Sequence, residues 1–92
     1  MMGEHQVVSR HENYAVVYKQ YDAGGTSYHA REVMQDSYQL VQYDSTGRVI
    51  YMSAAHKSIR HLTVHIKACQ AYLPRFQHLI PWLIELVVEE GM

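Results

Sequence analysis

The sequence predicts an α+β fold, a small antiparallel β-meander of three to four strands followed by two carboxy-terminal helices packed on one face. Two observations lead to it. Residues 13–53 contain short runs of tyrosine and β-branched residues that are separated by turn-forming residues. Residues 54–88 instead repeat apolar residues every three or four positions, the spacing of an amphipathic helix. For 92 residues we expect a single domain, 1–92, with residues 1–12 as a candidate flexible amino-terminal segment.

Four stretches of the first half are candidate strands. NYAVVYKQY (13–21) is followed by DAGGTS, whose glycines suit a chain reversal. SYHAREVM (27–34) and YQLVQYD (38–44) can each alternate, and DSTG leads as a hairpin turn into RVIYMS (48–53). A single helix over 27–43 is the alternative to two strands, although the tyrosine and valine content favours strands. Its helical stripe would consist of Ala30, Val33, Met34, Ser37 and Val41.

Two helices are predicted for the last third of the chain. The first covers residues 54–73, with Ser53 as its amino-terminal cap and Pro74 at its end. Its inward stripe is Ala55, Ile59, Leu62, Ile66, Cys69 and Leu73. The second starts near Pro74, is kinked or restarted by Pro81 and stops at Gly91. Its inward stripe is Phe76, Leu79, Ile80, Leu83, Ile84, Val87 and Val88.

Charge is segregated along the chain, although the net charge is only −1. Residues 1–44 hold six acidic and three basic residues, which is −3. Residues 45–84 hold five basic and no acidic residues, which is +5, and three glutamates after residue 84 add −3. A DNA mimic needs a dense negative surface, so the near-neutral total argues against one. A local basic patch is compatible with this distribution.

The predicted helix at 54–73 carries a basic face. Four residues project opposite its apolar stripe: His56, Lys57, Arg60 and Lys67. No acidic residue in the segment can pair with them, so the face is solvated surface, a contact for phosphate or a contact for an acidic protein. Tyrosines on the predicted strands could stack bases, although tyrosine is equally common in protein interfaces. These are Tyr14, Tyr18, Tyr28, Tyr38, Tyr43 and Tyr51.

The second predicted helix also has apolar residues outside its inward stripe. Trp82 and Leu86 lie one turn apart on a different face, so we expect a second apolar surface there. A homodimer or a docked partner protein would cover it, and tryptophan is a frequent interface anchor. The alternative is that both side chains pack under the sheet or against the first helix.

Histidine and cysteine are concentrated between residues 56 and 69 but fit no metal-site pattern. His61 and His65 are four residues apart and could chelate one ion, which makes them weak metal candidates. Cys69 lies about 12 Å along the helix from His61, too far to share one zinc, and we expect a buried thiol. No paired-ligand spacing, nucleophile elbow or phosphate-binding glycine loop occurs. We therefore predict no cofactor, no metal and no enzyme activity.

The sequence favours a non-enzymatic protein-binding module whose partner is an acidic protein or a ribonucleoprotein surface. The candidate partner-binding residues are Lys57, Arg60, Lys67, Arg75, Trp82 and Leu86. Small size, a single cysteine and the lack of a catalytic set are typical of inhibitors that phages and mobile elements direct at a host complex, CRISPR complexes among them. The alternatives are a nucleic-acid-binding protein that uses the helix at 54–73 and, third, a small metal-dependent enzyme.

The expected location is the cytoplasm. One cysteine cannot form an internal disulfide, which favours a reducing compartment. The longest apolar stretch, at residues 79–88, contains Pro81 and Glu85 and is too short to span a bilayer. We therefore expect no membrane insertion.

Overall fold

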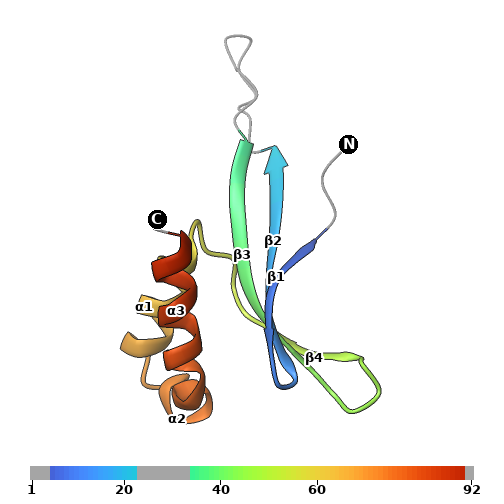
Figure 1. The fold of residues 1–92 in the computed structure, drawn as a ribbon, viewed down its shortest axis with the longest axis vertical. Helices are drawn as coiled ribbons and strands as arrows, with labels where there is room; N and C mark the ends of the chain where they lie inside the picture. The colour runs from blue at the N-terminus through green and yellow to red at the C-terminus, as the bar shows by residue number, and fades with distance from the viewer. Residues whose placement is uncertain (1–4, 23–33, 91–92) are drawn as a thin grey trace.

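The computed structural model describes residues 5–22 and 34–90 and confirms the predicted α+β fold. Four strands form one antiparallel sheet in the order β1-β2-β3-β4, and the helices lie on one side of it (Figure 1). The strands are β1 (Gln6–His11), β2 (Tyr14–Asp22), β3 (Met34–Tyr43) and β4 (Val49–Met52). The helices are α1 (Ile59–Ala68), α2 (Leu73–Phe76), the 3₁₀ helix η1 (Gln77–Leu79) and α3 (Ile80–Glu90). None of the described helices is long and apolar enough to cross a membrane.

The strands differ from the prediction at two places. β2 and β3 pair along nine residues, so residues 34–43 are one continuous strand. The helix alternative is wrong for this part of the chain, and so is the predicted break between strands 27–34 and 38–44, because residues 35–37 pair with β2 as well. Residues 23–33, which include the turn predicted at DAGGTS apart from Asp22, lie outside the described residues. Residues 6–11, which we expected in a flexible segment, form β1, because they pair with β2 and contact α3 through Ser9.

The hairpin predicted at DSTG is confirmed. Gly47 has a φ of 86°, a left-handed conformation that suits glycine. The Oδ1 atom of Asp44 accepts hydrogen bonds from Thr46 Oγ1 at 2.6 Å, Thr46 N at 2.8 Å and Arg48 N at 2.9 Å. These hydrogen bonds lower the pKa of Asp44, because each favours the charged carboxylate. The bond from the Thr46 hydroxyl has the largest effect, and the bond from the Arg48 amide has the next largest. Asp44 therefore serves to hold this turn.

The first helix begins later than predicted. Ser58 caps α1, since its Oγ accepts from His61 N at 3.1 Å, and the predicted cap Ser53 does not. Ser53 still belongs to the sheet, where its backbone N donates to Leu40 O at 2.9 Å and its Oγ accepts from Leu40 N at 2.9 Å. His56 then forms a bridge with Tyr38 of β3. These contacts keep the chain extended, so the helix starts only at Ile59.

The helix ends also differ from the prediction. α1 ends at Ala68 rather than at residue 73, because Cys69 adopts an extended conformation with φ −88° and ψ 111°. A turn then leads into α2, where Pro74 occupies the first turn as expected. α3 restarts at Ile80, next to Pro81, so the predicted restart is confirmed.

The main core lies between the sheet and the helices. From the sheet it contains Tyr14, Val16 and Leu40; from the helical layer it contains Ile59, Leu62, Ile66, Phe76, Leu79, Trp82, Leu83 and Leu86. The central part of the predicted stripe of α1 is thus buried, whereas Cys69 and Leu73 are half-buried and Ala55 is exposed. A stripe of this kind supplies most of the stability of a helix in a small domain.

The stripe predicted for the second helix is partly wrong. Trp82 and Leu86, expected on a second exposed surface, are only 8% and 6% exposed, whereas Ile84 and Val88, expected inside, are 44% and 58% exposed. The reason is that α3 packs against both α1 and β1. Trp82 Nε1 donates to Ser9 Oγ at 3.0 Å, so the helix turns its tryptophan side toward the sheet. Trp82 and Leu86 are therefore core residues, and no exposed anchor exists at these two positions.

Candidate interaction surfaces

The β-sheet has two faces, and the helices cover only one of them (Figure 1). Side chains alternate between the faces along each strand, and paired residues share a face. Val16 and Leu40 pack under the helices, whereas Ala15 and Val41 form a separate cluster on the other side, which we call the open face. The described side chains of the open face are Val7, Arg10, Ala15, Val17, Lys19, Gln35, Ser37, Gln39, Val41, Tyr43, Val49 and Met52.

The centre of the open face is an apolar cluster that none of the described helices covers. Its buried members are Ala15, Val17 and Val41, with Tyr43 packed against them. At the two edges of the sheet, Val7 on β1 and both Val49 and Met52 on β4 are nearly half exposed. A solvated sheet face is usually polar, so the exposed apolar residues around this buried centre are a candidate contact surface.

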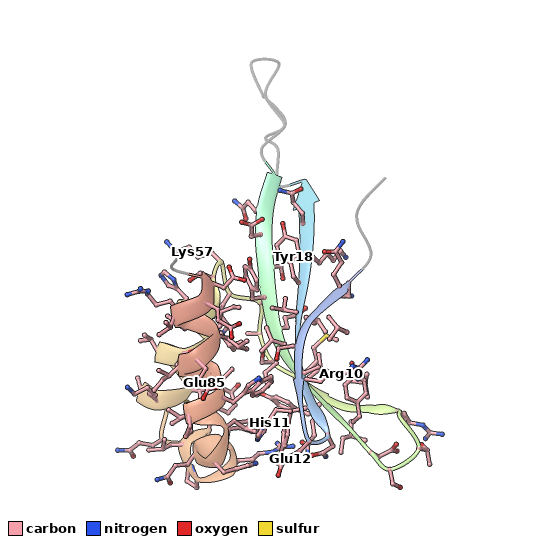
Figure 2. All side chains as sticks on the ribbon, in the orientation of Figure 1. Arg10, His11, Glu12, Tyr18, Lys57 and Glu85 are labelled. Carbon is pink, nitrogen blue, oxygen red and sulfur yellow. The ribbon has the colours of Figure 1, made fainter. Side chains whose placement is uncertain are left out.

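Charge on the open face is positive in the part of the chain that the structure describes. Its two charged residues are Arg10, whose guanidinium lies 5.6 Å from the centre of the Tyr43 ring, and Lys19. Figure 2 shows Arg10 on the side of the sheet that faces away from the helices. Asp36 of β3 points to the helix side, where the Tyr18 hydroxyl donates to its carboxylate at 2.7 Å. An acidic group that approached the open face would therefore meet attraction.

The predicted basic face of the first helix is different. Lys57 and Arg60 line a groove of about 320 Å³ at the amino-terminal end of α1. Asp36 of β3 and Glu90 of α3 line the same groove, so the fold brings two carboxylates to cations that have no acidic neighbour in their own segment. Lys57 also precedes the helix rather than lying on it, because α1 begins at Ile59. The surface at this end is mixed in charge.

The remaining predicted cations lie elsewhere. Lys67 is exposed, two turns further along α1 from Arg60. Arg75 in α2 donates from Nη2 to Gln42 Oε1 at 3.0 Å, and its guanidinium lies over the Tyr51 ring at 4.6 Å. Figure 1 shows α2 at the opposite end of the helical layer from the carboxyl end of α3. The four predicted cations therefore do not form one continuous surface.

The two histidines named as weak metal candidates have different neighbours. The Nδ1 atom of His61 lies 2.8 Å from Ser58 Oγ at the cap of α1. The ring of His65 lies 4.9 Å from that of His56 and 5.3 Å from that of Tyr72. Among the described residues, no three or more histidine, cysteine, aspartate or glutamate side chains are placed to hold a metal ion together.

His56 lies between β4 and α1, and its side chain is partly buried. Its Nε2 atom is buried and has no hydrogen-bond partner among the described residues. Burial lowers the pKa of His56, and the nearby His65 and His61 lower it further because a second positive charge would be repelled. The neutral imidazole is thus the form that fits the segment between β4 and α1.

The tyrosines predicted to stack bases mostly face the helices. The tyrosines on the helix side of the sheet are Tyr14, Tyr18, Tyr38 and Tyr51. Tyr43 is on the open face with Arg10 over its ring, and Tyr28 lies outside the described residues. The described part of the sheet therefore offers no row of exposed rings for base stacking.

The alternation of apolar and polar residues in the sequence does not predict the open face, although one sequence pattern indicates its apolar centre. In β2, four consecutive residues, Tyr14 to Val17, are buried, and a continuous apolar run indicates a strand with both faces covered. Arg10 and Lys19 carry no such signal, because only the strand register places them on one face.

Comparison of the chain with protein-family models, with curated proteins and with solved structures finds no match. The comparisons therefore assign it no function.

Proposed function

We propose that this chain is a non-enzymatic protein-binding module that docks an acidic protein surface on its open face. The observation that carries the proposal is the combination found there. An apolar centre is flanked by exposed apolar residues at both sheet edges. Of the described residues on the open face, the two that are charged, Arg10 and Lys19, are both basic. Apolar contact supplies affinity in such an interface, and complementary charge supplies orientation and association rate.

The rigidity of the open face supports the same proposal. Its residues lie on strands whose backbones are fixed by nine antiparallel pairs between β2 and β3. Its apolar centre is already packed, because Ala15, Val17 and Val41 are buried in the free chain. A surface that is ordered before binding loses little conformational entropy when the partner docks.

A nucleic-acid partner has less support. On α1, the cations Lys57 and Arg60 share their groove with Asp36 and Glu90, which would repel phosphate. On the open face, the guanidinium of Arg10 already lies over the ring of Tyr43, where a base would have to stack. Binding to an acidic protein or to the protein part of a ribonucleoprotein fits the described surface better, and a blocking role against a host complex is one form that such binding would take.

The test is an affinity capture from a bacterial lysate with two matched charge reversals. The variant Arg10→Glu/Lys19→Glu reverses one arginine and one lysine on the open face, and Arg60→Glu/Lys67→Glu reverses the same residue types on α1. We expect the wild type and the α1 variant to capture the same protein after nuclease treatment, and the open-face variant to lose it. Equal capture by both variants would contradict the proposal, and loss of capture on nuclease treatment would support the nucleic-acid alternative.

A further inference from the structure

We propose that the segment joining β4 to α1 is an acid-sensitive contact: when His56 takes up a proton, this segment detaches from β3 while the sheet and the helices stay folded. The proposal goes beyond the proposed function, because it concerns a regulated contact beside the helices rather than the open face. Two backbone hydrogen bonds hold the segment to β3, Tyr38 N to His56 O at 2.7 Å and His56 N to Tyr38 O at 2.9 Å. Both bonds are made by His56, so a change at this residue acts directly on the contact.

The position of the His56 ring suits its neutral form. Its Nε2 atom is buried and has no hydrogen-bond partner among the described residues. In a protonated ring both nitrogens carry a hydrogen, whichever tautomer the neutral ring adopts, so Nε2 would become a charged donor without an acceptor. Burying a charged donor that lacks an acceptor costs more free energy than burying a neutral one. Protonation therefore favours a conformation in which the ring reaches water.

The groups around His56 do not compensate for the added charge. The ring of His65 lies 4.9 Å away and can only gain positive charge itself. The carboxylate of Asp36 lines the same pocket as His56, but it accepts from the Tyr18 hydroxyl at 2.7 Å. The titratable and charged groups that surround the ring among the described residues are His61 and His65 of α1, Asp36 and Tyr38 of β3, and the adjoining Lys57.

The opposite end of the helical layer responds to acid in the other direction. Glu12, in the turn between β1 and β2, has its Oε1 atom 3.9 Å from Nε2 of both His11 and His78, and His78 belongs to η1. These exposed pairs contribute little free energy, but protonation of either histidine adds attraction to the carboxylate. Figure 2 shows His11 and Glu12 at the far end of the molecule from Lys57, which adjoins His56. Among these contacts, acid therefore weakens the one at His56 and not those at Glu12.

Detachment would change the groove at the amino-terminal end of α1. Tyr38, Lys57 and Ser58 line this groove, and Ser58 also caps α1. Release of His56 from Tyr38 would let the wall formed by Lys57 and Ser58 move away from β3. The groove is therefore the surface that acid would alter.

Amide hydrogen exchange tests the proposal when it is measured by NMR at about pH 7.5 and about pH 5.5, on either side of the pKa of free histidine near 6.5. After correction for the intrinsic pH dependence of exchange, protection of the Tyr38 and His56 amides should fall several-fold in acid. The limit is about tenfold, the change for uptake of a single proton about one unit below that pKa. Exchange of both amides should not respond to low urea concentrations, because a local opening exposes little surface.

The variants and the control isolate the histidine. In His56→Gln and, separately, His56→Phe, residue 56 takes up no proton, so protection of the two amides should be the same at both pH values. His78→Gln removes an exposed histidine at the other end of the helical layer and should keep the wild-type response. Equal protection at both pH values in the wild type, or an acid response retained in both His56 variants, would overturn the proposal. A urea dependence as steep as that of the central β2 amides would also overturn it, because the segment would then open only when the whole chain unfolds.

Discussion

Val16 and Val17 are neighbours on β2, yet they belong to two different parts of the molecule. Val16 faces a core of 11 buried residues that joins the sheet to all the helices, and Val17 faces a cluster of three on the open face. Both side chains are buried, so burial alone does not distinguish their roles. Within the described part of the chain, the helices cover Val16, whereas neighbouring side chains of the sheet cover Val17. We call the side of the sheet under the helices the covered face. We infer that the covered face provides stability and that the open face is available for binding.

The largest expected effect on the free energy of unfolding is that of replacing Trp82. This substitution tests whether the side of α3 that carries Trp82 belongs to the main core. Trp82→Ala should lower the free energy of unfolding by about 3 to 5 kcal/mol, because it removes a buried ring that stacks on His11 at 5.3 Å and donates to Ser9. Ile84→Ala on the exposed side of the same helix should cost less than about 1 kcal/mol. Chemical denaturation measures both. A fully stable Trp82→Ala protein would place this ring outside the core.

The next prediction compares the loss of stability when each of the two neighbouring valines, Val16 and Val17, is replaced. Val16→Ala should cost about 2.5 kcal/mol, because the core around it is closed by sheet and helices and cannot collapse into the cavity. Val17→Ala should cost about 1 kcal/mol, because water and the flexible side chains of the open face can fill the space. Urea denaturation of the two variants gives the difference. Equal losses would mean that the open face contributes to stability as much as the covered face does.

A smaller effect is expected for the pH dependence of folding stability, to which His56 contributes. His56 lies in the extended segment between β4 and α1 and forms a β-bridge with Tyr38. The folded state lowers the pKa of His56 from 6.5, so the unfolded chain binds the proton more readily. The stabilising contribution is therefore complete above pH 6.5 and is lost as the pH falls below it. Among the described residues, His65 and His61 on α1 lie close to His56, and Lys57 and Asp36 line the same pocket as His56.

The variant His56→Gln isolates that contribution. Thermal unfolding between pH 7.5 and pH 5, a range chosen to bracket the pKa of free histidine near 6.5, should show a steeper decline for the wild type than for His56→Gln. His5→Gln, at an exposed position, should follow the wild-type curve. Parallel curves for all three proteins would show that the buried Nε2 atom has no influence on stability.

Much of the fold follows from local sequence patterns. A small antiparallel meander with helices on one side was predictable because turn residues such as Gly47 separate runs with different apolar periods. The strand β1 was not predicted, because residues 6–11 were expected in a flexible segment. The start of α1 was not, since Ser53 and Ser58 are both good caps and the choice depends on Ser53 bonding to Leu40 across the sheet. The buried side of α3 was also not predictable. Its sequence is apolar almost all round, so only the position of β1 decides that Trp82 rather than Ile84 points inward.

The candidate site was less predictable than the fold. Exposure of Lys57, Arg60 and Lys67 was expected and is confirmed, but the carboxylates of Asp36 and Glu90 reach that region from other elements. The open face depends on strand register, which combines residues as distant in sequence as Arg10 and Met52. Local spacing carries no information about such pairings, so the surface became visible only in the folded chain.

The most direct test of the claim that the open face binds the partner is methyl NMR of the chain titrated with the captured protein. Valine and methionine methyl groups report from both sides of the molecule: Val7, Val49 and Met52 on the open face, and Val64 and Val88 on the outer surface of the helices. We expect the first set to shift or broaden on binding and the second set to stay unchanged, because only the open face would be covered. Changes confined to Val64 and Val88 would contradict the account and place the binding surface on the helical layer.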